Sequence, residues 1–243
     1  MLGCNCPVCR SGDPRNRRRR VSLLVEHAGA TVLVDTSPDL REQLLPFRLR
    51  HLDGVLYTHG HADHSHGIDD LRPINYHMGA PIEAYGTEET LRSVRERFGY
   101  AFQPPGNYWA RPCLRPRAIG TAPFTVAGLA VTPFVQGHGS GTTTGYLFGA
   151  REAAYSTDVD RLSDAVIEQL AGIGLWVVDC LGYEPHPSHA HLEVTLGWIA
   201  RVRPKLAVLT HMSHQFDYER LRGELPSGTL PGHDGMVIDT AAL

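Results

Sequence analysis

Side chains that can bind metal ions gather in one short stretch of the sequence. The segment YTHGHADHSHG follows an apolar run, and its six positions 59–64 contain four such residues: His59, His61, Asp63 and His64. If the apolar run is a strand, its carboxyl end presents His59 and His61 in the same direction. Asp63 and His64 follow as the chain turns into a helix. Each pair can bind a divalent ion, and mixed imidazole and carboxylate donors suit zinc, manganese or iron.

A second cluster of potential metal ligands opens the chain. The segment GCNCPVCR (3–10) contains Cys4, Cys6 and Cys9. A closed structural zinc site needs four ligands, so a fourth is expected elsewhere in the chain. A redox or disulfide cluster is the alternative. No signal peptide is visible, so we expect a cytoplasmic location, where thiols stay reduced.

Composition describes an ordinary globular protein with a slightly acidic balance. The 243 residues carry a formal net charge of -3, with 42% hydrophobic and 20% charged residues. This excludes an overall basic surface, so nucleic acid is not an expected partner, and we interpret the run RNRRRR (15–20) as a solvated face. No apolar run reaches the length that a membrane span needs. The chain can bury a substantial core, and we predict one domain over residues 1–243.

Apolar runs of strand length alternate with helical patterns and must position these ligands. The strand-like runs are 21–26, 31–36, 54–59, 82–86, 124–134, 145–149, 153–160, 175–180, 206–211 and 236–240, and helical periodicity marks 37–46, 87–99, 161–172 and 193–202. Thr87 can cap the second helix and Gly99 can end it. Residues 102–116 lack periodicity, and a flap near a site or a plain surface connection are both open for them. The order indicates α/β layers with helices covering sheets.

The motif H-x-H-x-D-H after a strand resembles the signature of the metallo-β-lactamase superfamily of dinuclear metallohydrolases. The resemblance implies an αββα sandwich of two mixed β-sheets flanked by helices, with the metals at one edge. It also implies later ligands, for which His138 in VQGHGSG, Asp158 in YSTDVD and His211 in VLTHMSH stand in the expected order. The implied sets are His59, His61 and His138 on one ion, Asp63, His64 and His211 on the other, and Asp158 bridging both.

Two further residues take roles from the same resemblance. Asp35 follows a strand-like run, where superfamily members commonly have an acidic residue that orients a ligand histidine; a helix N-cap is its alternative role. His189 in HPSHAHLEVTL stands where phosphodiesterase members have a histidine near the scissile phosphate, acting as general acid or as a cation. A structural role is the alternative for His189. His191 is a neighbouring candidate and His186 a poorer one.

The opening cysteines narrow the resemblance to one branch. The pattern G-C-x-C-x-x-C before an arginine-rich segment, with H-x-S-H-Q-x-D late in the chain, resembles the PhnP-type phosphodiesterases accessory to the carbon–phosphorus lyase pathway. Three cysteines and a histidine hold a structural zinc in that family. This implies an N-terminal zinc loop over residues 3–20, with the ligands Cys4, Cys6, Cys9 and His214. Family members usually carry a strand before the cysteines, so we expect the first strand to be truncated here.

The implied activity is hydrolysis with two divalent ions, zinc or manganese, in the active site and one structural zinc. The favoured reaction is cleavage of a small phosphodiester, cyclic ribosyl or linear, by a hydroxide that bridges the ions. A lactonase or thioester hydrolase is the alternative within this fold. A non-catalytic metal-binding protein, such as a pyrroloquinoline quinone biosynthesis protein, is the alternative from another class. The small-molecule substrate is the expected partner, and a homodimer is common in the family.

Overall fold

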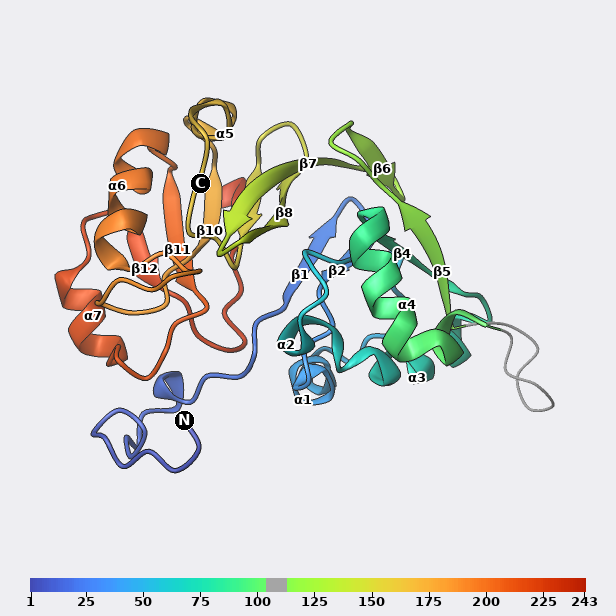
Figure 1. Ribbon diagram of the computed structural model, residues 1–243, viewed down its shortest axis with the longest axis horizontal. Coiled ribbons are helices and arrows are strands. Elements are labelled where there is room, and N and C mark those ends of the chain that lie inside the picture. The colour runs from blue at the N-terminus through green and yellow to red at the C-terminus, as the bar shows by residue number, and fades with distance from the viewer. Residues whose placement is uncertain (104–112) are drawn as a thin grey trace. The chain divides into compact units, whose positions relative to one another are not determined.

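The chain divides into two units, one continuous and one discontinuous in sequence. The structure, a computed structural model, describes residues 1–103 and 113–243. The continuous unit is Arg20–Thr132, and the split unit combines Met1–Arg19 with Pro133–Leu243. Each unit has its own cluster of buried hydrophobic side chains. Figure 1 traces the chain from blue to red.

A five-stranded mixed sheet frames the continuous unit, in the order β1-β2-β3-β4-β5. Its strands are β1 (Leu23–His27), β2 (Ala30–Val34), β3 (Gly54–Leu56), β4 (Ile82–Gly86) and β5 (Leu114–Ala118). β1 and β2 form an antiparallel hairpin, whereas β2 to β5 run parallel to their neighbours. Because parallel strands end at one edge, the residues after β2 and β3 are brought together there.

Helices cover the sheet of the continuous unit and complete its core. They are α1 (Leu40–Leu44), α2 (Ala62–Ser65), α3 (Arg72–Met78) and α4 (Glu88–Phe102), with the short 3-10 turns η2 (Leu45–Phe47) and η3 (Ile68–Leu71). In the core, Val55 of β3 packs in one cluster with Ile74 of α3 and Val94 of α4. Figure 1 shows α4 alongside β4 and β5.

The predicted cap of α4 is confirmed, and its predicted end is wrong. The Thr87 hydroxyl accepts a hydrogen bond from the Thr90 backbone N–H at 3.2 Å. The helix does not end at Gly99 but runs to Phe102, with a non-helical residue at Phe98. Phe98 and Phe102 both pack against the core of this unit, and their burial outweighs the low helix propensity of glycine.

A seven-stranded mixed sheet has the order β12-β11-β10-β9-β8-β7-β6. Its strands are β6 (Phe124–Val126), β7 (Leu129–His138), β8 (Gly141–Phe148), β9 (Ala153–Ser156), β10 (Leu175–Asp179), β11 (Leu206–Thr210) and β12 (Thr229–Pro231). β6 and the beginning of β7 belong to the continuous unit and the rest to the split unit. β9 to β12 are parallel to one another, which brings the ends of β9, β10 and β11 to one edge.

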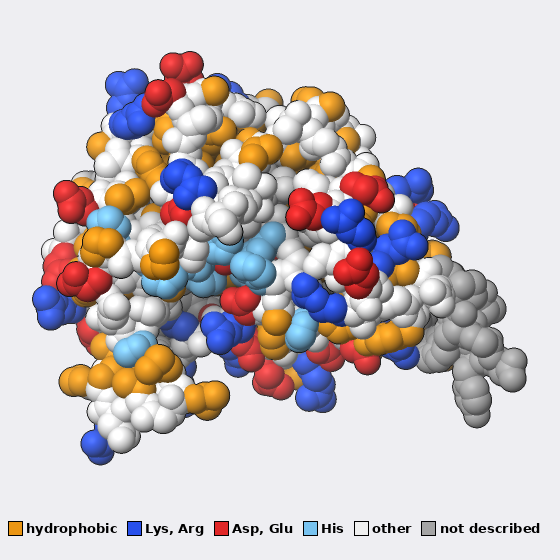
Figure 2. Space-filling view, viewed as in Figure 1, with side chains coloured by type: hydrophobic (Ala, Val, Ile, Leu, Met, Phe, Trp, Pro, Cys, Tyr) orange, Lys and Arg blue, Asp and Glu red, His pale blue; other side chains and the backbone are white. Residues whose placement is uncertain are grey.

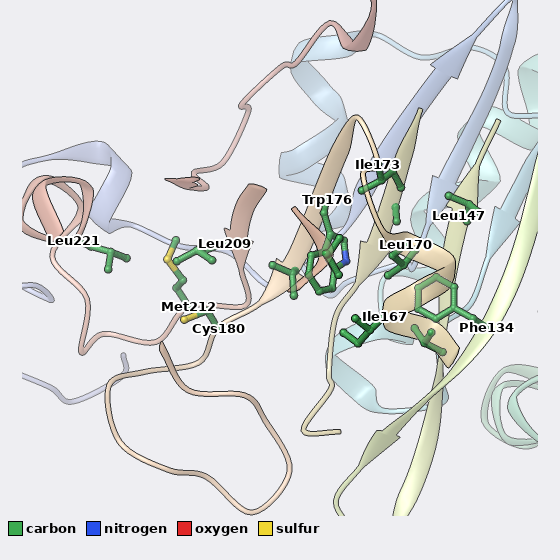
Figure 3. Close-up of a cluster of buried hydrophobic side chains, with 14 of the residues drawn as sticks. Phe134, Leu147, Ile167, Leu170, Ile173, Trp176, Cys180, Leu209, Met212 and Leu221 are labelled. Carbon is green, nitrogen blue, oxygen red and sulfur yellow. The ribbon is translucent and has the colours of Figure 1, made fainter. Parts of the chain in front are cut away.

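The core of the split unit forms around Trp176 on the central strand β10. Trp176 is fully buried, and its indole N–H donates to the Ser156 hydroxyl at 3.0 Å. The helices α5 (Asp164–Leu170), α6 (Leu192–Val202) and α7 (Tyr218–Glu224) contribute side chains to this cluster, Leu170 among them (Figure 3). The short 3-10 turns η1 (Pro14–Asn16) and η4 (Thr240–Ala242) complete the unit.

The strand expected at 236–240 is wrong. That segment forms no strand, and Val237 has 78% of its surface exposed, because no neighbouring strand pairs with this apolar run. The sequence pattern does not predict four short elements, β5, β12, α3 and α7. Polar residues within them obscure the spacing of their apolar residues. For the flap or surface connection expected at 102–116, residues 104–112 lie outside the described residues. In the described part of the chain, no helix combines the length and apolarity that crossing a membrane requires.

Candidate metal centres

The potential metal ligands lie at the carboxyl ends of strands. In the continuous unit, the chain leaves β3 at Leu56 and reaches His59 within three residues. In the split unit, His138 ends β7, Asp158 follows β9 and His211 follows β11. This edge of an α/β sheet is where ligands generally bind, because side chains there are not needed for packing between strands.

The motif group consists of His59, His61, Asp63 and His64 in the continuous unit. The ring centroid of His59 lies 4.4 Å from that of His61 and 4.4 Å from that of His64. The single turn of α2 carries Asp63 and His64, and an Oδ2 atom of Asp63 lies 3.8 Å from Nε2 of His64. The turn of α2 therefore brings Asp63 and His64 back toward the imidazoles of His59 and His61.

Asp35 orients His64 of the motif group. Its carboxylate is fully buried and accepts hydrogen bonds from the Thr58 backbone N–H at 2.8 Å and the Thr58 hydroxyl at 2.7 Å. Nδ1 of His64 lies 2.7 Å from the same carboxylate. A carboxylate on Nδ1 leaves Nε2 as the nitrogen that faces a metal. The N-cap of α1 is Asp39 and not Asp35, which leaves the carboxylate to His64 and Thr58.

The Asp158 group consists of His138, Asp158, His189 and His211 in the split unit. Nε2 of His211 lies 3.5 Å from Oδ1 of Asp158. Nε2 of His138 and Nε2 of His189 each lie 3.8 Å from its Oδ2. One ligand atom from each of Asp158, His189 and His211 lies within 4.8 Å of the other two. Three imidazoles thus surround both oxygens of one buried carboxylate.

Two imidazoles of the Asp158 group are held by their Nδ1 atoms. Nδ1 of His138 donates to the Ser188 carbonyl at 2.7 Å, and Nδ1 of His189 donates to the Asp179 carboxylate at 2.8 Å. Both Nε2 atoms then point toward Asp158. This donor chemistry fits a divalent ion, because metal-binding histidines in proteins usually donate their second N–H to a carbonyl or carboxylate.

Asp179 was missed by the sequence reasoning. It ends β10 in LWVVD, is fully buried, and also accepts the Val159 backbone N–H at 2.9 Å. The available signal was an aspartate at the end of an apolar strand, next to strands that are followed by potential ligands. The same signal points to Asp35. Its partner His189 lies ten residues away in the loop before α6, which no local pattern indicates.

Backbone strain accompanies these residues. Asp35, Asp158 and His211 all have positive φ, at 61°, 52° and 55°. Non-glycine residues rarely adopt this region, and where they do the surrounding structure holds them there. Around Asp158, the Thr157 hydroxyl donates to its Oδ1 at 2.8 Å and the Thr143 hydroxyl donates to its backbone carbonyl at 2.9 Å. The strain is the cost of turning these side chains out of the strand direction.

The cysteine group forms the third cluster and lies in the split unit. One ligand atom from each of its members lies within 4.8 Å of the others: Cys4, Cys6, Cys9 and His214. Nδ1 of His214 lies 3.7 Å from Sγ of Cys4 and 3.6 Å from Sγ of Cys6. None of these cysteines is in a disulfide. Hydrogen bonds from the Cys9 backbone N–H and from His214 lower the pKa of the Cys6 thiol to about 6, and the set fits a closed zinc site.

The N-terminal arm (Met1–Arg19) is also attached without metal. Asn16 donates to the Asp217 carboxylate at 2.8 Å and accepts the Tyr218 backbone N–H at 2.9 Å. Nη1 of Arg18 donates to the Ser213 carbonyl at 3.1 Å. The arm therefore contacts the segment 213–218, which begins two residues after His211 and contains His214.

The remaining histidines lie outside the three groups. His66 packs edge-on against Phe98, and His233 lies against Tyr218. His191 is the N-cap residue of α6 without a side-chain hydrogen bond to the helix. His186 is exposed and lies beside His189, with ring centroids 5.2 Å apart. Figure 2 shows histidine side chains at the surface on the face that it draws.

Known proteins are similar to this chain in both sequence and fold. Residues 30–212 match the family described as the beta-lactamase superfamily domain. A crystal structure of a diphosphatase from the PhnP family is similar with a TM-score of 0.89 and 35% identity, over 97% of this chain and 90% of that chain. Its similarity extends the match to both mixed sheets and their helices.

This chain matches only part of the length of two curated relatives. An octanoyltransferase of Porphyromonas gingivalis is 37% identical over 98% of this chain and 49% of the relative. The coenzyme PQQ synthesis protein B of Methylobacterium nodulans is 29% identical over 72% of this chain and 66% of the relative. The chain thus spans about half the length of the first relative and under two thirds of the second.

Proposed function

We propose that this chain, which belongs to the β-lactamase superfamily and within it to the PhnP family, hydrolyses small phosphoric esters of the phosphodiester or diphosphate type. Membership of the superfamily supports the general part of this proposal, a metal-dependent hydrolase. The phosphoric ester is the finer inference. It is supported by the 35% identical diphosphatase of the PhnP family, of which the chain covers 90%.

The proposed active-site ligands are the motif group and three members of the Asp158 group. We infer that His59, His61 and His138 would hold one ion, that Asp63, His64 and His211 would hold a second, and that Asp158 would serve both. When bound, two zinc or manganese ions would polarise a phosphoryl oxygen and lower the pKa of a water molecule. The donor types and the hydrogen-bonded Nδ1 atoms of His64 and His138 support this assignment.

The observation that carries the proposal is the pair His189 and Asp179. Asp179 accepts from Nδ1 of His189 at 2.8 Å, while Nε2 lies 3.8 Å from Oδ2 of Asp158. A buried carboxylate on Nδ1 holds the ring in one orientation, as in hydrolytic triads. His189 can then give the Nε2 proton to the leaving oxygen, alkoxide or phosphate, of an ester held beside Asp158. A thiolate leaving group would gain less from such an acid, because it leaves without a proton.

The substrate class is tested with a panel of esters. Hydrolysis of bis(p-nitrophenyl) phosphate, a nucleoside diphosphate sugar, a lactone, a β-lactam and an octanoyl thioester would be measured side by side. The thioester is included because the Porphyromonas relative is named an octanoyltransferase. We expect turnover of the phosphoric esters only, lost in His59→Ala and His189→Ala and retained in the exposed-histidine control His77→Ala. Cleavage of the lactone or thioester alone would refute the proposal.

A non-catalytic biosynthesis protein is the second candidate, because one relative is named coenzyme PQQ synthesis protein B. Metal content separates the two. The hydrolase proposal requires about three metal ions per chain, two in the active site and one on the cysteine group. One ion per chain, removed by Cys6→Ser, together with no turnover of any ester, would favour the second candidate. The small-molecule ester is the partner we propose, while a homodimer and a cytoplasmic location stay predictions.

A further inference from the structure

Four imidazoles of the split unit contact one another in a row, formed by His138, His211, His189 and His186. Of these four, His186 has no role in the hydrolysis proposed above. Its ring lies 5.2 Å from His189 at an interplanar angle of 52°. His189 in turn stacks on His211 at 4.7 Å and meets His138 edge-on at 4.9 Å. His186 therefore lies beyond His189, at the outer end of the row.

His186 differs from its neighbours in exposure and in partners. The side chain of His189 is 11% exposed and that of His211 is 12% exposed, whereas His186 belongs to the exposed residues. Among the described residues, the potential metal-ligand groups do not include His186. An exposed imidazole beside an ordered catalytic one is available to a solute.

Contacts with Ser188 indicate which nitrogen of His186 can donate. The Ser188 backbone N–H donates to Nδ1 of His186 at 3.4 Å, and the Ser188 hydroxyl lies 3.4 Å from the same nitrogen. A backbone N–H can only donate, so Nδ1 is the unprotonated nitrogen of the neutral ring. The ring proton is then on Nε2, and His186 offers one N–H donor away from its own loop.

The loop holds His186 rigidly with respect to the Asp158 group. Pro185 and Pro187 flank His186 and restrict its backbone. The Ser188 carbonyl accepts from Nδ1 of His138 at 2.7 Å, which attaches the loop to a residue of the group. A donor on a restrained loop loses little conformational entropy on binding, so its hydrogen bond is realised as affinity.

We propose that His186 is a substrate-binding residue whose Nε2–H donates a hydrogen bond to the second, non-reacting phosphoryl group of a diphosphate-type ester. The inference rests on the proposed function and names the substrate class of that site. With the scissile phosphorus beside Asp158 and His189 at its leaving oxygen, the group beyond the leaving oxygen extends outward past His189. A diphosphate ester has an anionic phosphoryl group at that position, which a neighbouring N–H donor would bind.

Steady-state kinetics of His186→Ala test the assignment on two substrates. We expect kcat/KM for a nucleoside diphosphate sugar to fall about tenfold, mainly through KM, because a hydrogen bond to a charged group is lost. Turnover of bis(p-nitrophenyl) phosphate, which has no second phosphoryl group, should stay within about twofold. His186→Gln, whose amide retains a donor, should recover most of the loss, and the exposed-histidine control His77→Ala should match the wild type on both substrates.

Binding of inorganic pyrophosphate and orthophosphate to the metal-loaded protein gives a second readout. Calorimetry should show a weaker pyrophosphate affinity in His186→Ala and an unchanged orthophosphate affinity. Equal losses on both substrates, or no loss on either, would overturn the role of His186 and leave the proposed function standing. A wild type that cleaves neither phosphoric ester would overturn both.

Discussion

At the scale of single residues, buried carboxylates determine which imidazole nitrogens face the proposed metals and substrate. Asp35 does this for His64 in the continuous unit, and Asp179 does it for His189 in the split unit. Both carboxylates are fully buried and both also bind a backbone N–H, so their own positions are fixed twice. Orientation through Nδ1 is thus a repeated device in this chain.

Replacing Asp179 by asparagine tests this device. The amide can turn its N–H toward His189, which reverses the tautomer and removes the carboxylate that orients the ring. We expect Asp179→Asn to lower kcat about 10- to 100-fold at an unchanged metal content, measured on the phosphoric ester panel. Asp164→Asn, a change in an exposed ion pair with Arg201, is the matched control. Full activity in Asp179→Asn would show that His189 needs no orienting partner.

At the scale of elements, strand ends and the tight turns after them carry the potential ligands. The motif group depends on α2, and the turn that follows α2 packs against the segment after β2. The Gly67 backbone N–H donates to the Thr36 carbonyl at 2.9 Å. A Cβ atom at Gly67 would overlap the Ser37 carbonyl oxygen and lie 2.9 Å from Cβ of Leu40. Only glycine permits this approach of two backbones.

Gly67→Ala should therefore destabilise the protein. We expect a loss of about 1–3 kcal/mol in the free energy of unfolding, because backbone atoms cannot move aside as a flexible side chain would. Thermal or denaturant unfolding of the variant measures it. Gly197→Ala is the matched control, since a Cβ there meets nothing within 4 Å and alanine is the better helix former in α6. Equal stability of both variants would contradict the close approach.

Asp217, the N-cap of α7, gives the structure a pH dependence on the acid side. Hydrogen bonds from the Arg220 backbone N–H and the Asn16 side chain hold the pKa of its carboxyl below the usual 3.8. The native state thus binds fewer protons than the unfolded state, and the stabilisation is present above pH 4 and lost as the pH falls through the native pKa. The melting temperature of Asp217→Asn should be lower than wild type at pH 7, with the gap closing below about pH 4. A gap of constant size would refute it.

At the scale of the whole molecule, the N-terminal arm is joined to residues 213–218 in two independent ways. The cysteine group links it through His214, and Asn16 links it through Asp217 and Tyr218. Two segments that are far apart in the sequence are thereby held together by a proposed zinc ion and by a set of ordinary hydrogen bonds. A structural metal on the cysteine group would act together with this polar network to stabilise a short arm that has little apolar surface to bury.

Metal removal combined with Asn16→Ala tests the two attachments. Chelator treatment alone, or Asn16→Ala alone, should leave the arm resistant to trypsin, although it contains several arginines. Both changes together should release it and expose rapid cleavage within 10–20, observed by mass spectrometry. Release by the chelator alone would show that the zinc is the only effective attachment. Cys6→Ser should reproduce the effect of the chelator on the arm and lower the melting temperature.

Much of the fold followed from apolar periodicity, and the failures have a common cause. The buried strands β10 and β11 are near-continuous apolar runs and were placed within one or two residues. The run at 236–240 has the same composition but no neighbouring strand. α3 and α7 are short, with exposed polar faces, so their helical period is not visible without the sheet that they cover.

The sequence by itself determined the types of potential ligand, because the motif H-x-H-x-D-H and the opening cysteines are local patterns, and it also indicated that the motif follows a strand. Only the tertiary structure decided which groups hold these ligands in orientation. Asp35 and His64 are 29 residues apart, and His138 and Ser188 are 50 residues apart. Such pairs depend on the register of parallel strands and on the loops after them, which local propensity does not encode.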